Sequence, residues 1–523
     1  MDDARDVFVR RYRDEGWWRP ELLTDHVRAW AAKLPYVTAV VDGPLRLTWA
    51  QLWDSARRTA AQLARLGVGA GDVVSTQLPN GVEIIVSHLA AELVGAVHNP
   101  VALQFRTHEL DQIHSLLEPK LMVYPATAQR DDFAAIHAET TPGRNCRVES
   151  VGVLFDVDAE SEIVGFEQSP MAAHEAAFVL NTSGTVSVKG VTHSHEDALY
   201  STRTVGIDIV GLSPEDTVLC IIPMTWGGGL AWGLRVALHA GATLISVPRW
   251  DARAAAEIID AERCSYVYGP PTVARDLVAL SGEWRPQRPL TMICAGAPIP
   301  RYLCRDAKSL LSMRLLPGYG QTEHLHSTLG RPADTEAQLT TTDGRPLPGV
   351  ELKTVDEAGD PSEGGGEIWC RGPNVAMGYF GQPGFSAQTF RADGWQTTQD
   401  LGRLDADGFL SVSGRKRDII IRGGLNVSPR EVEELLQRHP DVAEAAVIGV
   451  QDARYGERIC AFIVPRTASA PTTAELSAAL TAFGVAQFKH PEEVRTIDAL
   501  PLTATGKVRH ESLREMLRAE TAQ

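Results

Sequence analysis

The sequence predicts an α/β protein with a large N-terminal domain of mixed, largely parallel sheets and helices, followed by a small α+β C-terminal domain. Residues 40–280 alternate apolar, strand-like runs with Ala/Leu/Arg segments of helical period, which is typical of βαβ units. A strand at 72–78 followed by a helix at 83–93 is one clear example. After about residue 340, short strand-like runs alternate with Gly/Asp turns, which favours antiparallel pairing. The 523 residues are enough for about two to four domains.

The C-terminal domain is predicted from the pattern that follows a charged turn at 414–418. Ser428, Pro429 and Glu431 predict a helix start with a capping box and Pro at the first helical position. The elements expected after this start are a helix at 429–438, strands at 445–450 and 459–464, a helix near 473–483 and a last helix after His510.

Charge and composition argue against several classes of protein. The 66 acidic and 50 basic residues give a formal charge of −16, which disfavours a surface for nucleic acid, so an anionic substrate must be held by a few local cations. No apolar run approaches the roughly 20 residues of a membrane span, and Met1-Asp2-Asp3 does not begin a signal peptide. We therefore expect a cytoplasmic protein without a membrane span. The seven scattered cysteines, without a CxxC pair, are expected to be buried thiols.

Two glycine-containing motifs can bind phosphate groups. The run from Asn181 to Gly190 combines hydroxyls, glycines and Lys189, and can offer N–H groups and a cation to a polyphosphate, although it is not a Walker A motif. In the run from Gly318 to Glu323, which follows 295–298, the carboxylate can hold Mg²⁺ while Thr322 contacts a phosphate. Ordinary surface turns remain the alternative for both motifs.

Two further motifs lie nearer the C-terminus. Asp400 follows a polar run and can bind the two hydroxyls of a ribose. Lys507 lies in a glycine turn, and only eight of the 50 basic residues are lysines. Because Lys and Arg differ in shape and donor geometry, a lysine at this position indicates a functional role.

The order and spacing of these motifs resemble the adenylate-forming superfamily of acyl-CoA synthetases, carrier-protein adenylation domains and luciferases, over essentially residues 10–515. The opening from Tyr12 to Trp18 is most similar to aryl- and alicyclic-acid ligases, such as those for dihydroxybenzoate and cyclohexanecarboxylate. The resemblance implies ATP, Mg²⁺ and CoA as cofactors and a small carboxylic acid as substrate. It also implies a fold in which residues 1–415, with a small β-barrel-like part, bind ATP and the acid, and residues 416–523 form a mobile domain that swings about Arg417.

Residue roles are carried over from the superfamily as implications of the resemblance. Catalysis is assigned to Lys507, Thr322 and Glu323, with the metal at Glu323. The residues expected to bind ATP or AMP are Thr182, Ser183, Gly184, Thr185, Lys189, Gly296, Ala297, Pro298, Tyr319, Gly320, Asp400 and Arg415. The expected acyl pocket comprises Trp226, Gly227, Gly228, Gly229, Trp232 and Gly318, and the expected CoA tunnel comprises Gly423 and Gly424.

Three departures distinguish this chain from the usual superfamily pattern. The loop at 182–190 is one residue shorter and lacks the second Gly and the Pro, so weaker binding of the β,γ-phosphates is expected. Trp226 replaces the usual His, and Gln399 replaces the usual Gly before Asp400.

The region 224–234 favours a bulky alicyclic, aromatic or polycyclic acid, because it has two Trp, four Gly and no charge. An amino-acid substrate is disfavoured, since its α-ammonium group would need a buried carboxylate. Such acids include terpenoid-derived acids of bacterial secondary metabolism and antibiotic biosynthesis, as in an acyl-CoA synthetase of the platensimycin type. The alternative for residues 227–229 is a turn that enters a helix.

Two other functions remain open at the level of sequence. The acyl group can pass to a carrier protein or a partner ligase instead of CoA, or the chain can be a non-catalytic nucleotide-binding homologue. The sequence leaves open whether the chain is a monomer or a homodimer.

Overall fold

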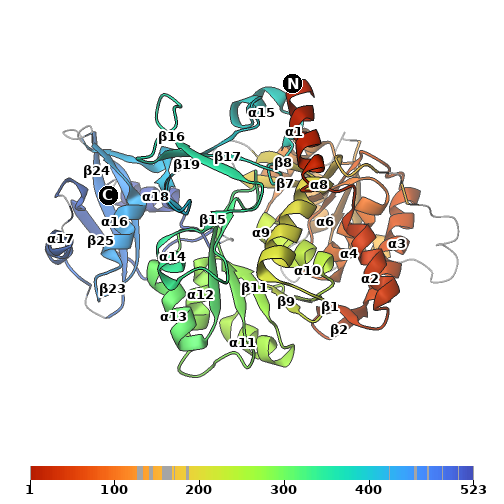
Figure 1. Cartoon of the computed structure of the whole chain (residues 1–523), viewed down its shortest axis with the longest axis horizontal. Helices are drawn as coiled ribbons and strands as arrows, with labels where there is room; N and C mark the ends of the chain where they lie inside the picture. Colours follow the sequence, from red (N-terminus) through yellow and green to blue (C-terminus); the bar gives the residue numbers. More distant parts are fainter. Residues whose placement is uncertain are drawn as a thin grey trace.

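The computed structural model describes residues 2–125, 133–140, 145–155, 168–169, 171–183, 188–422, 425–452, 456–467, 470–483, 485, 487–503 and 506–521. Four sheets organise this part of the chain, and helices cover the two large ones (Figure 1). The expected α/β class, with a large N-terminal domain and a small C-terminal one, is confirmed.

The largest sheet has nine strands and a parallel centre. Its order is β15-β14-β13-β12-β11-β9-β10-β1-β2, and only the pairs at its two edges are antiparallel. The strands are β1 (Thr38–Asp42), β2 (Leu45–Thr48), β9 (Thr217–Cys220), β10 (Thr243–Ser246), β11 (Tyr266–Gly269), β12 (Thr291–Cys294), β13 (Arg314–Tyr319), β14 (Thr328–Leu329) and β15 (Arg345–Pro346). The helices that follow these strands are α9 (Gly227–Gly229), α10 (Val236–Ala240), α11 (Ala252–Ala261), α12 (Pro271–Ala279), α13 (Arg301–Leu311) and α14 (Glu336–Thr341).

The second sheet has seven strands in the order β18-β8-β7-β4-β3-β5-β6. Its strands are β3 (Val73–Thr76), β4 (Val97–Pro100), β5 (Leu121–Tyr124), β6 (Arg147–Ser150), β7 (Ala176–Ser183), β8 (Val188–Ser194) and β18 (Gly378–Tyr379). Its helices are α3 (Trp49–Arg65), α4 (Val82–Leu93), α5 (Thr107–Leu117), α6 (Phe133–Thr140), α7 (Val151–Phe155) and α8 (His195–Thr202). The strand and helix expected at 72–78 and 83–93 are confirmed as β3 and α4.

One apolar core joins the two large sheets. It contains Val40 and Tyr266 of the first sheet, Val74 and Phe178 of the second, and residues of the helices α2 (Leu23–Lys33), α3, α4 and α10. Two π-helices, η1 (Arg203–Val210) and η2 (Leu230–Arg235), also contribute to it.

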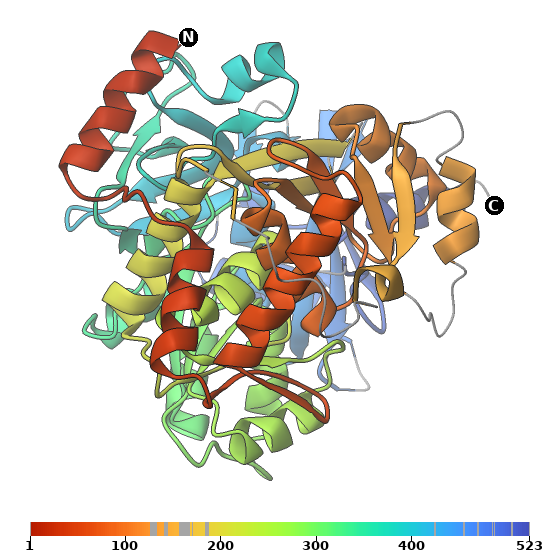
Figure 2. The ribbon, with the colours of Figure 1, turned by 90° about the vertical axis from the view of Figure 1, so that its right-hand side faces the viewer.

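A four-stranded antiparallel sheet follows, as the Gly/Asp turns predicted. Its order is β16 (Glu351–Val355), β17 (Gly366–Arg371), β19 (Gln396–Leu404) and β20 (Leu410–Arg415), with helix α15 (Pro383–Thr389) between two of its strands. The N-terminal helix α1 (Asp2–Asp14) lies beside this sheet (Figure 2), where Arg11 Nη1 donates a 3.1 Å hydrogen bond to Glu351.

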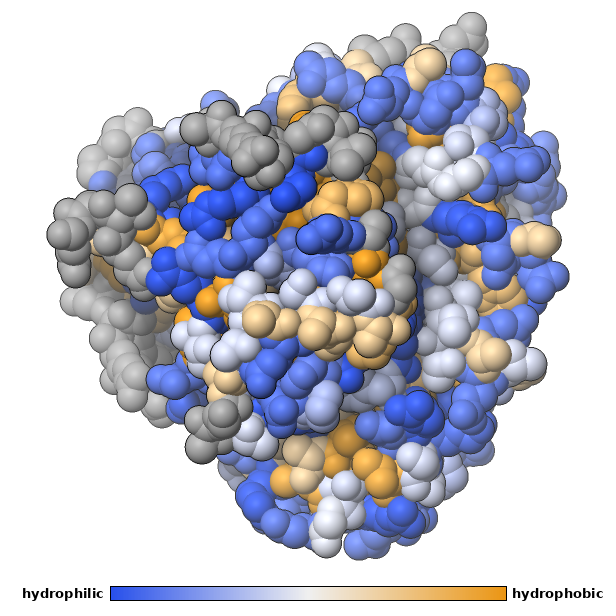
Figure 3. Space-filling model, turned by 90° about the vertical axis from the view of Figure 1, so that its left-hand side faces the viewer, coloured by the Kyte–Doolittle hydropathy of each residue, from blue (hydrophilic) through white to orange (hydrophobic). Residues whose placement is uncertain are grey.

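The C-terminal elements appear in the predicted order. They are η3 (Lys416–Asp418), β21 (Ile420–Arg422), β22 (Leu425–Val427), α16 (Pro429–Leu436), β23 (Val442–Asp452), β24 (Gly456–Pro465), α17 (Thr473–Ala482), η4 (Gln487–Lys489), β25 (Glu493–Thr496) and α18 (His510–Thr521). Figure 3, which faces the left-hand side of Figure 1, shows a mostly hydrophilic surface with small, separate apolar patches.

The capping box expected at residue 428 is only half formed. Ser428 Oγ accepts a bond from the N–H of Glu431, and Pro429 occupies the first helical turn, as predicted. The Glu431 carboxylate, however, pairs with Lys489 Nζ at 2.6 and 2.8 Å. The prediction of a reciprocal box was wrong because a charge-assisted hydrogen bond to an ammonium group is stronger than one to a backbone N–H.

The cysteines bear out the expectation with one correction. Six of the seven are buried, but Cys146 is half-exposed, and all seven are free thiols. Among the helices that the structure describes, none is long and apolar enough to cross a membrane.

Candidate active site

The site is built at the carboxyl ends of three adjacent parallel strands. Because β11, β12 and β13 run in parallel and pair in register, the loops that follow them meet at one edge of the sheet. The loop after β12 holds Ala295, Gly296, Ala297 and Pro298, and the loop after β13 holds residues 320–323. Gly296 has a φ of +88°, is exposed, and has no described heavy atom within 4 Å of the position a Cβ would take, other than its own neighbours. A flat ring such as adenine can therefore lie against it.

Asp400 is the most highly organised carboxylate of the site. It is 5% exposed, and its Oδ2 accepts hydrogen bonds from Tyr319 Oη at 2.9 Å and from Gln321 Nε2 at 2.6 Å. The antiparallel register of β19 and β20 places Arg415 opposite Asp400, and Arg415 Nε lies 3.1 Å from Oδ1. A carboxylate held in one orientation by three donors has remaining lone pairs for ligand hydroxyls.

Gln399, the residue that replaces the usual Gly, has the left-handed backbone conformation that favours glycine. Its φ is +60°. Its backbone N–H and its Nε2 both donate to Glu367 Oε1, at 3.2 and 3.0 Å, and Glu367 Oε2 pairs with Lys416 Nζ at 3.2 Å. The two hydrogen bonds to one carboxylate hold the residue in this disfavoured conformation next to Asp400.

Tyr379 lies between Glu323, the carboxylate expected to hold the metal, and Lys189 of β8. Tyr379 Oη donates a 2.9 Å hydrogen bond to Glu323 Oε1, and Lys189 Nζ lies 5.3 Å from the centre of the Tyr379 ring and 4.2 Å from that of Phe385. Burial, and next the charge of Glu323, raise the pKa of Tyr379. A single half-exposed carboxylate fits Mg²⁺, which takes one or two carboxylates together with substrate phosphates and water.

Two of the residues expected to bind the β,γ-phosphates, Thr182 and Lys189, lie opposite each other on the antiparallel strands β7 and β8. The next pair is Ser183 with Val188. Gly184 and Thr185 lie outside the described residues, as do Gly423 and Gly424 of the expected CoA tunnel. Of this group the structure places Thr182 and Lys189 on the side of the site where Tyr379 lies.

A buried histidine that the sequence analysis missed contacts the backbone of Thr322, which is expected to contact the α-phosphate. His193 Nε2 lies 2.8 Å from the backbone oxygen of Thr322, and its Nδ1 lies 2.6 Å from Asp197 Oδ1. Asp197 orients His193, and His193 holds the backbone of Thr322 in place. The sequence held a local signal for the contact between His193 and Asp197. The run His193-Ser194-His195-Glu196-Asp197 places Ser194 as the cap of α8, with Asp197 in its first turn.

The three glycines of the expected acyl pocket differ in their surroundings. They form the short helix α9, which leads into η2, so the alternative of a turn that enters a helix is correct as local geometry. A Cβ on Gly229 would lie 2.3 Å from Pro223 O, one on Gly228 would lie 2.8 Å from Tyr268 Cε1, and one on Gly227 would lie 3.3 Å from Leu180 Cδ1. The expectation that all three widen the pocket is wrong for Gly229, because backbone already fills that space.

The two tryptophans do not form one pair of walls. Trp226 lies edge-on to Phe105, with ring centres 6.4 Å apart. Trp232 is 2% exposed and lies 4.7 Å from the ring of His326 and 6.2 Å from that of Tyr268. Gly318 also lies beside His326, since a Cβ on Gly318 would lie 2.8 Å from His326 Cε1.

The Lys507 turn of the C-terminal domain reaches the same edge of the large sheet. Gly506 has a φ of +75°, and a Cβ there would lie 2.9 Å from Thr272 Oγ1, in the first turn of α12, which directly follows β11. Within the turn, Thr503 N–H donates to Lys507 O at 2.7 Å, and Thr503 Oγ1 accepts from Lys507 N–H at 3.0 Å. Lys507 is exposed, so the domain presents this cation beside the loops of the site.

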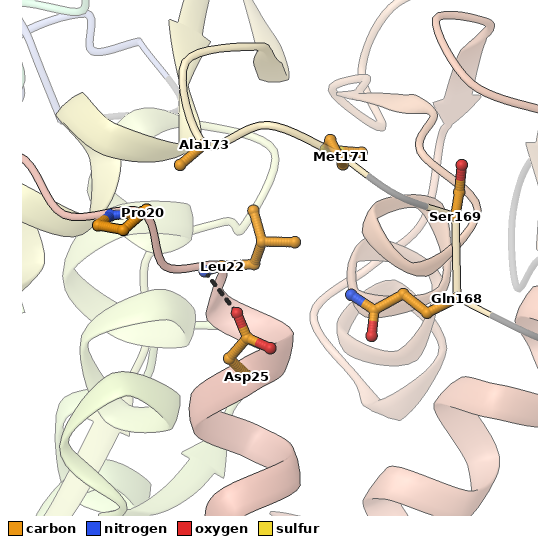
Figure 4. Close-up of a pocket in the computed structure, with 7 residues that line it drawn as sticks. All are labelled: Pro20, Leu22, Asp25, Gln168, Ser169, Met171 and Ala173. Atoms are coloured by element: carbon orange, nitrogen blue, oxygen red, sulfur yellow. Dashed lines mark hydrogen bonds between the residues drawn. The ribbon is translucent and has the colours of Figure 1, made fainter.

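A surface hollow of about 340 Å³ lies between the start of α2 and residues 168–173 (Figure 4). None of the expected site residues lines it. Its charged residue, Asp25, accepts a bond from the N–H of Leu22 at 3.0 Å and pairs with Arg28. The remaining lining residues are Pro20, Gln168, Ser169, Met171 and Ala173.

Comparison with known proteins agrees with this geometry. The AMP-binding enzyme family matches residues 27–380, and the AMP-binding enzyme C-terminal domain matches residues 431–507. A methyl-dioxo-octahydroindenyl propanoyl:CoA ligase of Rhodococcus jostii is 32% identical, over 92% of this chain and 95% of its own. A salicylyl-CoA synthase / salicylate adenylyltransferase of Streptomyces is 30% identical, over 98% of this chain and 96% of its own.

Solved structures of the same kind are also similar. The ATP-bound crystal structure of MatB from Rhodopseudomonas palustris has a TM-score of 0.84 and 30% identity, with 94% of this chain and 98% of that chain covered. The resemblance expected from the motifs is confirmed, and the chain belongs to the AMP-binding enzyme family of adenylate-forming enzymes.

Proposed function

We propose that this chain is an AMP-forming acyl-CoA synthetase that uses ATP, Mg²⁺ and CoA to activate a bulky, ring-containing carboxylic acid. The acid and ATP give an acyl adenylate and pyrophosphate, and CoA then displaces AMP to give the acyl-CoA. The observation that carries this proposal is the meeting of Gly296, Thr322, Glu323 and Asp400 at one sheet edge, with the Lys507 turn against it.

The first step needs positioning and cations rather than a base. An oxygen of the acid's carboxylate attacks the α-phosphorus, and the bond from that phosphorus to the bridging oxygen breaks as pyrophosphate leaves. Lys507 and Thr322 would hold the two reacting anions together, and Asp400 and Arg415 would fix the ribose. Glu323 would hold the Mg²⁺, which supplies charge neutralisation on the phosphates.

The hairpin residues bind the outer phosphates in this proposal. Thr182, Ser183, Gly184, Thr185 and Lys189 would contact the β,γ-phosphates, and Gly296, Ala297, Pro298, Tyr319 and Gly320 would surround the base and ribose. Lys189 supports this role, since it lies beside the ring whose hydroxyl contacts Glu323.

In the second step, the CoA thiol attacks the acyl carbon and AMP leaves. We place the moving boundary between residues 1–415 and 416–523, with the hinge at Arg417, and assign Gly423 and Gly424 to the path of CoA. The 3₁₀ turn at 416–418, between β20 and β21, supports a hinge there, because it separates the antiparallel sheet from the last one.

The proposed substrate class is supported by the names of two relatives and by the apolar residues beside Gly227 and Gly228 in this chain. The two relatives above are named for a polycyclic and an aromatic acid. In this chain, Trp232, Tyr268 and Leu180 supply flat or apolar surface beside Gly227 and Gly228. We place the reaction in the cytoplasm, where ATP and CoA are available.

The test is a screen of ring-containing carboxylic acids by ATP–pyrophosphate exchange, followed by thioester analysis with CoA and with a carrier protein. Exchange with ring acids and a CoA thioester are expected. Exchange with a thioester formed only on carrier protein would identify the second candidate, which the name salicylate adenylyltransferase of one relative favours. Absence of exchange with every acid would identify a non-catalytic homologue. Light scattering of the full chain distinguishes monomer from homodimer.

A further inference from the structure

Two aromatic rings hold the side chain of Lys189 on β8. Its Nζ lies 4.2 Å from the centre of the Phe385 ring and 5.3 Å from that of the Tyr379 ring, which are distances of cation–π contacts. Among the described residues no carboxylate forms an ion pair with Lys189, whereas Lys489 pairs with Glu431. A carboxylate cancels much of a lysine's charge. A ring face holds the ammonium group and leaves its charge available for an anion.

The two rings have a fixed position relative to β8. Strand β18 pairs antiparallel with β8, where Tyr379 lies opposite Val191. Helix α15, which carries Phe385, is fastened to β18, because Ser386 Oγ accepts a 2.8 Å hydrogen bond from the N–H of Tyr379. The centres of the Phe385 and Tyr379 rings lie 4.9 Å apart. The lysine therefore lies against a surface that the strand pairing itself sets in place.

The same tyrosine contacts the carboxylate expected to hold the metal. Tyr379 is 6% exposed, and its Oη donates a 2.9 Å hydrogen bond to Glu323 Oε1. One side chain thus places Lys189 and Glu323 relative to each other. In the proposed function both residues act on ATP, Lys189 on the β,γ-phosphates and Glu323 through Mg²⁺. A lysine that is already held loses less side-chain entropy when it binds a phosphate.

We propose that Phe385 is a positioning residue for ATP, whose ring holds Lys189 in place for the β,γ-phosphates without neutralising it. This inference rests on the proposed function and deepens it, because it adds a residue of α15 that acts through Lys189 and not by contact with the nucleotide. Loss of the ring frees the lysine, so the binding of ATP must then restrict it and becomes weaker. AMP has no β,γ-phosphates, and its binding should not change.

The experiment measures the affinity of the full chain for MgATP and for AMP by calorimetry. Phe385→Leu, which keeps an apolar side chain but removes the ring face, should weaken MgATP binding about threefold to tenfold and leave AMP binding unchanged. Phe385→Tyr, which keeps a ring, should retain the affinity of the wild type. In the Lys189→Met background, Phe385→Leu should have no further effect.

Phe390→Leu is the matched control. Phe390 also contacts the Tyr379 ring, with 5.4 Å between the ring centres, but the described rings over Lys189 are those of Tyr379 and Phe385. Its loss should leave the affinities for both nucleotides in place. Thermal unfolding of each variant controls for the fold, and Phe385→Met, which also removes the ring, takes the place of Phe385→Leu if that variant does not fold.

The outcomes separate this inference from the proposed function. Unchanged or tighter binding of MgATP in Phe385→Leu, equal weakening of MgATP and AMP, or the same loss in the Lys189→Met background overturns the role of Phe385 and leaves the synthetase intact. A wild type that binds neither nucleotide, or that exchanges pyrophosphate with no acid of the ring-acid screen, overturns the proposed function itself.

Discussion

Gln399 Nε2 donates a 3.0 Å hydrogen bond to Glu367 Oε1, and this bond accompanies a φ of +60° at the residue directly before Asp400. A glycine would take that conformation without steric cost. Here a side chain from the neighbouring strand β17 holds a glutamine in it. The backbone conformation directly before Asp400 therefore depends on the carboxylate of Glu367.

The first prediction tests this dependence. Glu367→Ala should lower the free energy of unfolding by about 1 to 2 kcal/mol and raise the KM for ATP, because two donors of Gln399 lose their acceptor. Gln399→Gly should be tolerated, since it relieves the positive φ. In the Gln399→Gly background, Glu367→Ala should cost clearly less, as measured by denaturant unfolding of all four proteins. Equal costs in both backgrounds would show that Glu367 acts through Lys416 alone.

The second prediction concerns Lys507. Lys507→Ala should slow adenylation by about 3 to 4 kcal/mol of activation free energy, because it removes a cation from the reacting anions. Attack by CoA on a supplied acyl adenylate should change little. Single-turnover assays of the two half-reactions give the comparison, and Lys489→Ala, in the same domain but paired with Glu431, is the matched control. Equal losses in both half-reactions would place Lys507 outside the adenylation step.

The third prediction separates Glu323 from its partner. Glu323→Gln should weaken Mg²⁺ dependence and adenylation without loss of fold, and higher Mg²⁺ should restore part of the rate, because a hard anionic oxygen is lost while the shape is kept. Tyr379→Phe removes only the 2.9 Å hydrogen bond to Glu323 and should shift the Mg²⁺ dependence far less. The measurement is the adenylation rate against Mg²⁺ concentration. An unchanged profile in Glu323→Gln would identify the residue as part of an ordinary turn.

Much of the fold could be predicted from local sequence pattern. The helix α4 and the strand β3 follow from apolar periodicity, and the start of α16 follows from Ser428 and Pro429. Local pattern could not show that the capping box at Glu431 is incomplete. Lys489, which binds the Glu431 carboxylate instead, lies 58 residues further along the chain.

From the sequence, candidate site residues could be named only where a single residue lies in a recognisable motif. Asp400, Glu323 and Lys507 lie in recognisable runs, and the order of these runs identified the family. Tyr379 has no comparable local pattern. Its place beside Lys189 arises from the pairing of β18 with β8, which only the folded chain brings together.

The fourth prediction distinguishes the glycines of α9. Gly229→Ala should destabilise the fold by more than about 3 kcal/mol and lower activity on all acids, because its Cβ would meet Pro223 O at 2.3 Å. Gly227→Val should instead reduce kcat/KM for wide acids more than for short ones, since its neighbours are the flexible side chains of Leu180 and Leu325. Activity across acids of increasing width, with thermal unfolding as the control for fold, tests both. A proportional decline in Gly227→Val would show that residue 227 also serves backbone geometry alone.

The last prediction concerns a buried ion pair across the proposed domain boundary. Arg430 Nη2 of α16 lies 3.5 Å from Asp343 Oδ1, and both side chains are nearly inaccessible to solvent, at 8% and 5% exposure. The other oxygen, Asp343 Oδ2, accepts from the N–H of Val412 at 2.8 Å. Since the same arrangement of the domains places the Gly506 turn against Thr272, we expect this pair to stabilise the arrangement in which Lys507 faces the site.

Arg430→Ala should therefore slow adenylation by at least about tenfold, and thioester formation from a supplied acyl adenylate much less. Removal of one partner of a buried pair costs about 3 to 5 kcal/mol, and this cost falls on the arrangement in which the pair is formed. Glu434→Ala is the matched control. Glu434 accepts a hydrogen bond from Arg430 Nε within α16, so this variant removes a partner of Arg430 inside the C-terminal domain and leaves the ion pair with Asp343 in place. If Arg430→Ala and Glu434→Ala slow the two half-reactions to the same extent, the pair stabilises the C-terminal domain itself and has no part in choosing between its positions.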